Sequence, residues 1–210
     1  INRCLVGSEM CIRDRFMGHF NLETLAVSFS IAYVIFAAFE KKVCWWFGLA
    51  GSLIYIFIFY DVNLYMESLL SVYYAFMAVC GLFVWGKSEN KNHKRPIIKL
   101  DMRTHFLILL LIITLTAISG YILTEASDAY MPYLDSFTTW SSVIATILVV
   151  RKVLENWIYW ISIDTISIYI YLERDLNQTV FLYFIYLLIA ITGFLIWKKN
   201  FGYQSRKSTC

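Results

Sequence analysis

The chain has 210 residues, of which 60% are hydrophobic and 16% are charged, and its formal net charge is +3. A soluble domain of this size would carry charge on about a quarter of its residues. The composition therefore excludes an ordinary soluble domain and is typical of an integral membrane protein. The positive residues lie in loops between apolar segments, which argues against a nucleic-acid-binding protein.

Seven apolar segments alternate with short polar loops along the chain. A helix needs about 20 apolar residues to cross a bilayer, so seven spans would use roughly 140 residues and leave no room for a soluble domain. The predicted fold class is an all-α integral membrane protein with seven transmembrane helices. The predicted spans are Asn21–Phe39, Val43–Tyr60, Leu64–Trp85, His105–Thr124, Leu134–Val150, Leu154–Leu172 and Asn177–Trp197.

The segment Ile1–Arg15 does not fit this pattern. It lacks the apolar core and the small-residue cleavage site of a signal peptide, and it resembles translated adapter sequence. We expect it to be a non-native leader, with native sequence beginning near Phe16. Two of the five cysteines lie in it, and the other three show no disulfide or metal-ligand spacing, so the sequence predicts no metal and no cofactor.

The distribution of charge predicts the orientation of the helices. The first, third and fifth loops and the C-terminal tail together hold fourteen lysines and arginines, whereas the second, fourth and sixth loops hold only Arg174. Cytoplasmic loops of membrane proteins carry the excess of positive residues. The C-terminus is therefore predicted to be cytoplasmic and the N-terminus outside.

Landmark residues recur between the first three spans and the last three. Trp46 and Trp157 are 111 positions apart, which indicates one inserted residue relative to three other pairs. The pairs that lie 112 positions apart are Gly81 with Gly193, Trp85 with Trp197, and Lys87 with Lys199. Because the fourth span restores the orientation, the two triples are predicted to be parallel repeats with a substrate site near the midplane between them.

This repeat divides the chain into successive units. The first three-helix repeat is expected over 16–86 and the second over 134–199. A cytoplasmic basic loop over 87–104 and a linker helix with an outer loop over 105–133 connect them. Residues 200–210 form a cytoplasmic tail. The unit boundaries are 1–15, 16–86, 87–104, 105–133, 134–199 and 200–210.

The sixth span carries the densest set of polar residues. At about 100° per residue, five of its side chains fall on one stripe: Asn156, Trp160, Asp164, Ser167 and Tyr171. Lipid cannot satisfy such groups, so the stripe must face protein or a wet cavity. Aromatic faces combined with hydrogen-bonding groups suit a flat heteroaromatic ring on a ribose. The alternative is that Asn156 and Asp164 only join helices to one another.

Other spans supply further candidates for a substrate site. The third span presents Glu67, Ser71 and Tyr74 on one face, and the seventh adds Thr192. Tryptophans gather near the ends of membrane helices. Trp45, Trp46 and Trp197 are expected in that interfacial belt, and Trp157 is expected either there or in the substrate cavity.

The run Glu155-Asn156-Trp157-x2-Trp160, followed by Asp164-x2-Ser167, resembles the sixth-helix signature of the PnuC-type vitamin transporters, which take up nicotinamide riboside. The segments Gly193–Lys199 and Glu67–Leu70 are also similar to that family. The resemblance covers nearly the whole chain after Phe16. It implies a SWEET-like 3+1+3 arrangement, a homotrimer, and facilitated diffusion followed by trapping through a cytosolic kinase.

One stretch departs from the family pattern. Many members carry Asn-x-Tyr-Gly-Trp in the third helix, where this chain has Ala78-Val79-Cys80-Gly81-Leu82. Thiamine or riboflavin therefore remain alternative substrates. P-loop, CxxC and HExxH motifs are absent from the sequence, so no enzymatic activity and no catalytic residues are predicted. A non-transporting membrane sensor or scaffold is the second alternative.

Overall fold

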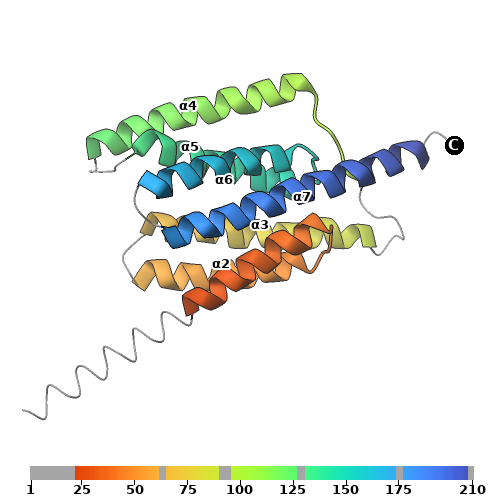
Figure 1. The fold of residues 1–210 in the computed structure, drawn as a ribbon, viewed down its shortest axis with the longest axis horizontal. Coiled ribbons are helices and arrows are strands. Elements are labelled where there is room, and N and C mark those ends of the chain that lie inside the picture. The colour runs from red at the N-terminus through yellow and green to blue at the C-terminus, as the bar shows by residue number, and fades with distance from the viewer. Residues whose placement is uncertain (1–21, 62–64, 90–95, 127–130, 174–176, 208–210) are drawn as a thin grey trace, which may run out of the picture.

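The computed structural model describes residues 22–61, 65–89, 96–126, 131–173 and 177–207. In this part of the chain it forms an all-helical bundle of seven helices (Figure 1). After a first helix, Leu22–Ala38, come α2 (Cys44–Asp61), α3 (Tyr65–Glu89), α4 (Met102–Ala126), α5 (Pro132–Val150), α6 (Asn156–Glu173) and α7 (Asn177–Lys207). The predicted leader lies outside the described residues.

The helices match the predicted spans to within a few residues, except that α7 continues well past Trp197 to Lys207. Five of the described helices, α2, α3, α4, α5 and α7, contain stretches long and apolar enough to cross a membrane. The first helix is shorter, and α6 carries the polar stripe that contains Asn156 and Asp164. The polar residues that make α6 a candidate site thus also lower its hydropathy below that of the five membrane-spanning helices.

Large apolar side chains cover the outside of the bundle. Soluble proteins rarely expose extensive apolar patches, so this surface suits contact with lipid. Among the most exposed aromatic residues are Phe57, Phe76, Phe83, Phe106 and Phe181.

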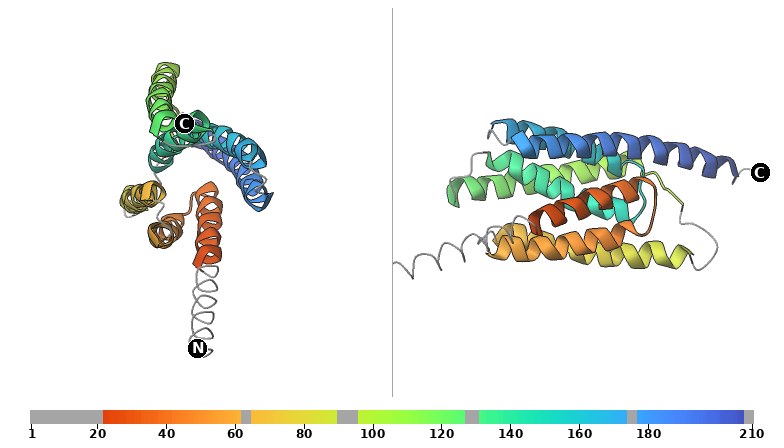
Figure 2. Two further views of the ribbon diagram at one scale, coloured as in Figure 1. Left: turned by 90° about the vertical axis from the view of Figure 1, so that its left-hand side faces the viewer. Right: turned by 60° about the horizontal axis from the view of Figure 1, so that its bottom comes forward.

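The helices pack as two groups with α4 at the edge (Figure 2). Among α2 to α7, α2 packs on α3 and α6 on α7, while α5 contacts α3, α4 and α6. The first helix contacts both groups: Phe29 lies against Gly51 of α2, and the backbone of Ala38 bonds to Trp197 of α7. It therefore lies where the two groups meet.

Exposed charges separate to opposite ends of the bundle. One end, which we call the basic end, holds the last turn of the first helix, the start of α4 and the C-terminal part of α7 (Figure 1). Its exposed basic residues include Lys41, Lys99, Arg103, Arg151, Lys198, Lys199 and Arg206. At the other end, α2, α4 and α6 finish near exposed Asp61, Glu125 and Glu173. This separation agrees with the charge alternation in the sequence.

The segment that leads into α4 crosses the basic end as a strap. The Ile98 amide donates to the Lys152 carbonyl at 3.0 Å, and the Leu154 amide donates back to Ile98 at 2.9 Å. The Ile97 amide donates to Oε1 of Gln204 at 3.0 Å. These bonds join the α5–α6 turn to the last turns of α7.

The first helix and α5 end in the same way. Glu40 and Lys152 have positive φ values of 55° and 57°, and they are 112 positions apart. The amides one residue later, in Lys41 and Val153, each bond at 2.9 Å to a carbonyl five residues back. This is the Schellman helix end, which usually uses glycine because other residues are strained there. The strained backbone at Glu40 and Lys152 indicates that a glutamate and a lysine side chain are required at these two helix ends.

Two tryptophan rings pack directly against glycines at the basic end. A Cβ atom on Gly81 would overlap the ring of Trp45, and one on Gly193 would lie 2.7 Å from the ring of Trp157. Trp45 therefore corresponds to Trp157, and the expected pairing of Trp46 with Trp157 is off by one residue. The offset is 112 throughout, without an inserted residue.

Most of the tryptophans expected at the membrane interface lie inside the bundle instead. Trp45, Trp157 and Trp197 are at most 2% exposed, whereas Trp46 is 60% exposed. Trp197 donates its N–H to the Ala37 and Ala38 carbonyls inside the bundle, whereas the N–H groups of Trp45 and Trp157 are buried without a partner among the described residues. Here the close approach to glycine creates interior space for the rings.

We expect Gly81→Ala and Gly193→Ala to destabilise the protein by about 1–3 kcal/mol each, because an added methyl group overfills a closely packed contact with a rigid ring. Thermal unfolding of the detergent-solubilised protein measures this. Gly202→Ala is the matched control, since a Cβ there meets nothing within 4 Å. Equal melting temperatures for all three variants would contradict the packing described here.

Candidate functional site

Two tryptophans bind the ends of helices in the opposite group. Nε1 of Trp85 in α3 donates to the Val150 carbonyl of α5 at 3.1 Å. Nε1 of Trp197 in α7 donates to the Ala38 carbonyl of the first helix at 3.1 Å. The donors are 112 positions apart, and so are Ala38 and Val150. The two bonds are thus the same contact made in both directions, and both satisfy carbonyls that a helix end leaves unpaired.

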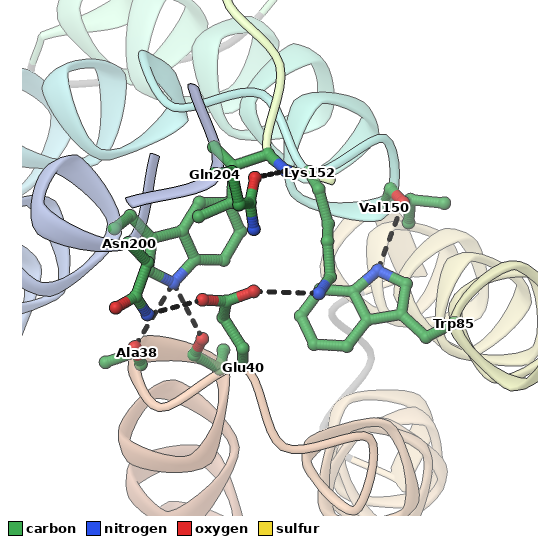
Figure 3. Close-up of polar contacts among 10 residues, drawn as sticks. Ala38, Glu40, Trp85, Val150, Lys152, Asn200 and Gln204 are labelled. Carbon is green, nitrogen blue, oxygen red and sulfur yellow. Dashed lines mark hydrogen bonds and ion pairs between the residues drawn. The ribbon is translucent and has the colours of Figure 1, made fainter. Parts of the chain in front are cut away.

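A buried ion pair lies between these two bonds. Nζ of Lys152 is 2.9 Å from Oε2 of Glu40, and both side chains are at most 10% exposed. Oε1 of Glu40 accepts a hydrogen bond from Nδ2 of Asn200 at 2.7 Å, and the Lys152 ammonium lies 4.6 Å from the ring centroid of Trp85. Figure 3 shows Glu40 between Lys152 and Asn200. We call Glu40, Lys152 and Asn200 the charged lock.

The charged lock connects three elements that are far apart in sequence. Glu40 follows the first helix, Lys152 follows α5, and Asn200 belongs to α7. A buried pair of this kind contributes specificity when its remaining hydrogen-bonding capacity is also satisfied. Here Glu40 uses both oxygens and Lys152 adds a cation–π contact. The basic end is therefore held together by a buried polar group in which both oxygens of Glu40 are bonded and the Trp85 ring lies against the ammonium of Lys152.

A second polar region lies farther along the bundle, where α6 meets α7. The rings of Tyr171 and Tyr183 stack with centroids 5.2 Å apart. The rings of Tyr183 and Tyr186 meet at 90° with centroids 5.9 Å apart. Tyr74 of α3 lies close enough to Tyr183 for an electrostatic interaction. We call Tyr74, Tyr171, Tyr183 and Tyr186 the tyrosine cluster.

The tyrosine cluster joins both helix groups. The hydroxyl group of Tyr74 lies close enough to that of Ser142 in α5 for the two to interact. Tyr186 interacts in the same way with Ser30 of the first helix, and Ser30 also interacts with Tyr55 of α2. Residues from six helices therefore converge on one region between the groups, which is the position expected for a substrate site.

Asp164 completes this region from α6. It is 4% exposed and lies within electrostatic reach of Tyr186. Ser167, one turn farther along α6, is also 4% exposed. The structure thus brings Asp164, Ser167, Tyr171 and Tyr74 of the predicted site into one region.

Other predicted site residues lie elsewhere. Asn156 begins α6 at the basic end and is fully buried; eight residues separate it from Asp164, which is about 12 Å along a helix. Its Nδ2 donates to the Val153 carbonyl, and its Oδ1 has no partner among the described residues. Trp160 is partly buried between these two levels.

The other three candidates lie on α3 and α7. Ser71 of α3, three residues before Tyr74, is 5% exposed. Thr192 is exposed on α7, and its hydroxyl donates to the Leu188 carbonyl of its own helix at 2.7 Å, so the structure does not bring it to the cluster. Glu67 lies in the first turn of α3, where the side chains are outside the described part.

Sequence reasoning missed Tyr183 and Tyr186. They are three residues apart, which places them on one face of a helix, and this spacing was the available signal. In the sequence, the two tyrosines lie in an apolar segment without other polar residues beside them, so nothing marked them as site residues. The described residues contain no group of three histidine, cysteine, aspartate or glutamate side chains that could hold a metal ion.

Breaking the charged lock should cost about 3–5 kcal/mol, because removing one partner leaves an uncompensated buried charge. We expect Glu40→Gln and Lys152→Met to lower the melting temperature, whereas Lys41→Gln, at an exposed neighbour, should not. The double variant Glu40→Lys with Lys152→Glu should regain part of the loss. A charge swap that is no more stable than the single variants would argue against a direct ion pair.

Comparison with known proteins places the chain in a family. The profile of the nicotinamide mononucleotide transporter family matches residues 21–199. Among curated relatives, the nicotinamide riboside transporter PnuC of Escherichia coli is 24% identical over 186 residues, covering 77% of this chain and 78% of that protein. The PnuC protein of Neisseria mucosa is 25% identical over 192 residues, covering 85% and 72%.

A solved structure supports the fold. The crystal structure of the vitamin B3 transporter PnuC superposes with a TM-score of 0.71 at 21% identity, covering 93% of this chain and 88% of that one. The resemblance found in the sequence is confirmed, and the relatives are transporters, as expected for a chain predicted not to be an enzyme. Because the family profile covers most of its length, the chain belongs to the nicotinamide mononucleotide transporter family and is a multi-pass protein of a bacterial transporter family.

Proposed function

We propose that this protein carries nicotinamide riboside, or a closely related vitamin, across the bacterial inner membrane by facilitated diffusion. Curated relatives of that name match most of the chain. The observation that supports a site inside this chain is the tyrosine cluster with buried Asp164, which lies between the two helix groups. Stacking faces beside hydrogen-bonding groups suit a flat ring attached to a sugar.

We infer that the bundle consists of two parallel three-helix repeats joined by α4. Three features support this: the matching helix ends at Glu40 and Lys152, the glycine–tryptophan contacts in both halves, and the reciprocal bonds of Trp85 and Trp197. All recur at an offset of 112 positions. α4 packs on α5 alone among α2 to α7, as expected of a linker.

Within this arrangement, Trp160 stacks on the substrate ring, while Asp164 and Ser167 bond to its polar edge or ribose. Asn156 would act nearer the basic end, where its unpaired Oδ1 offers an acceptor. The resemblance to the family further supports a homotrimer, for which the exposed apolar face of α4 offers a surface. Trapping of the imported vitamin would fall to a cytosolic kinase.

Purified protein in liposomes should admit nicotinamide riboside until the inside and outside concentrations are equal, at zero membrane potential and without response to a proton or sodium gradient. Trp160→Ala should weaken binding by about 5- to 150-fold, because losing one stacking aromatic costs about 1–3 kcal/mol. The control is Trp46→Ala, since that ring is exposed.

Thiamine and riboflavin are measured in the same assay, because the third helix lacks the aromatic motif common in the family. Uptake of thiamine or riboflavin in place of nicotinamide riboside would show that the protein is a vitamin transporter with a different substrate from the one proposed. A protein that binds none of the three and moves none would favour a sensor or scaffold.

The basic end should face the cytoplasm, in keeping with the positive-inside rule. In a cysteine-free background, a cysteine at Lys91 should react with an impermeant reagent only after the membrane is opened. A cysteine at Glu125 should react in intact cells. The opposite labelling pattern would invert the proposed orientation, with the N-terminus inside.

A further inference from the structure

The last turns of α7 continue past the apolar part of the helix. From Asn177 to Trp197 the helix contains no charged residue, and this stretch is about 32 Å long, close to the hydrocarbon thickness of a bilayer. Residues 198–207 therefore lie beyond the hydrocarbon, at the basic end (Figure 1). This α7 extension begins at the level where lipid headgroups begin.

One face of the α7 extension is bonded to the rest of the protein. Trp197 donates to the end of the first helix, Asn200 donates to Glu40 of the charged lock, and Gln204 accepts a bond from the strap. The spacing of three and four residues places these three side chains on one face of the helix. The opposite face is turned to the surroundings.

The outward face of α7 is an exposed apolar stripe that runs directly into basic residues. At about 100° per residue, all its members fall within a sector of about 100°. They are Phe181, Phe184, Leu188, Ile191 and Leu195, followed by Lys198, Lys199, Gly202 and Arg206. The five apolar side chains are 41–66% exposed, and the lysines and the arginine are also exposed. One helix face thus presents an apolar surface inside the bilayer and positive charge at its boundary.

Gly202 leaves an open position among these positive groups. A Cβ atom there would meet nothing within 4 Å. Lys198 is one turn before it and Arg206 one turn after it. Nζ of Lys198 lies 5.9 Å from the ring centroid of Phe194, and Nε of Arg206 donates to the Gly202 carbonyl at 3.3 Å. Both positive groups therefore reach back toward the bilayer, and no side chain fills the space at Gly202.

We propose that this face of α7 binds an anionic phospholipid. The headgroup phosphate lies over Gly202 beside Lys198, Lys199 and Arg206, and the acyl chains lie along the apolar stripe. Lysine and arginine form charge-assisted hydrogen bonds with phosphate oxygens, and basic residues at the cytoplasmic edge of a membrane helix attract anionic lipids. α7 contains no aspartate or glutamate that would oppose the phosphate.

The apolar stripe decides between a lipid and other negatively charged partners. A soluble anion would contact the basic residues alone, and an acidic protein in the cytoplasm would not reach the hydrocarbon beside Leu195. Only a molecule with both a phosphate and long apolar chains matches the whole face. The site does not depend on which vitamin the protein carries.

A lipid bound here acts on the charged lock from outside. Lys198 and Lys199 precede Asn200 directly, so the lipid and the lock hold the same turn of α7 from opposite faces. The bound phosphate also offsets the repulsion among neighbouring positive side chains. The α7 extension and its bonds to Glu40 and to the strap should therefore be more stable when the lipid is present.

The test uses the purified, full-length protein in a neutral detergent. Dioleoyl phosphatidylglycerol is the anionic probe, and dioleoyl phosphatidylcholine, with the same chains and no net charge, is the matched lipid. Native mass spectrometry measures how tightly each lipid is retained, and thermal unfolding measures its effect on stability. Phosphatidylglycerol should bind at least about tenfold more tightly and should raise the melting temperature more.

Variants separate this face from the rest of the basic end. Lys198→Gln with Arg206→Gln should weaken phosphatidylglycerol binding roughly 5- to 30-fold. The matched control, Lys41→Gln with Arg103→Gln, removes two exposed charges of the same end but outside α7, and it should retain the preference. Gly202→Leu keeps every charge and fills the open position, so it should weaken binding severalfold without lowering the melting temperature in detergent alone.

Several outcomes would overturn the proposal. Equal binding of the two lipids, or equal losses in the two double variants, would leave only a diffuse attraction to the basic end. Glycerol 3-phosphate should not stabilise the protein, and stabilisation equal to that by phosphatidylglycerol would assign the site to a free anion. Loss of subunits in place of lipid from the Lys198 and Arg206 double variant would assign this face to a second copy of the chain.

Discussion

The Glu40–Lys152 ion pair is the contact on which the arrangement of the two helix groups depends. It joins the end of the first helix to the end of α5, and Asn200 adds α7 through the second oxygen of Glu40. Both charged residues accept a strained backbone conformation that glycine would adopt freely. That strain is offset by a buried, fully bonded pair, which no pair of glycines could form.

The surrounding tryptophans make this contact possible. Trp85 and Trp197 donate to carbonyls that would otherwise end unpaired in an apolar environment, where unsatisfied backbone groups cost several kcal/mol. Their rings also exclude water from the pair. The basic end is thus held together by an ion pair and by two indole hydrogen bonds, while buried Asp164 lies with the tyrosine cluster farther along the bundle.

The positions of the helices could be predicted from the sequence because bilayer thickness fixes the length of an apolar span. The bounds of α2 and α5 differ from the predicted spans by two residues or fewer. The roles of the tryptophans could not be predicted, since hydropathy does not distinguish an indole at the interface from one that donates to a carbonyl inside. The helical stripe placed Asp164 and Tyr171 correctly on one face. It gave no information about α7, so Tyr183 and Tyr186 became visible only once the helices were packed together.

In the two-repeat arrangement proposed above, the ion pair between Glu40 and Lys152, which are 112 positions apart, joins the same position of the two halves. In an assembly of two identical three-helix subunits, each position on the twofold axis would face its own copy. Glutamate would then oppose glutamate, or lysine would oppose lysine, and the buried contact would be repulsive. A single chain that holds both halves can place different residues at these positions. In the proposed arrangement, the covalent link through α4 therefore permits an attractive contact between the two halves that no symmetric dimer of the same helices could contain.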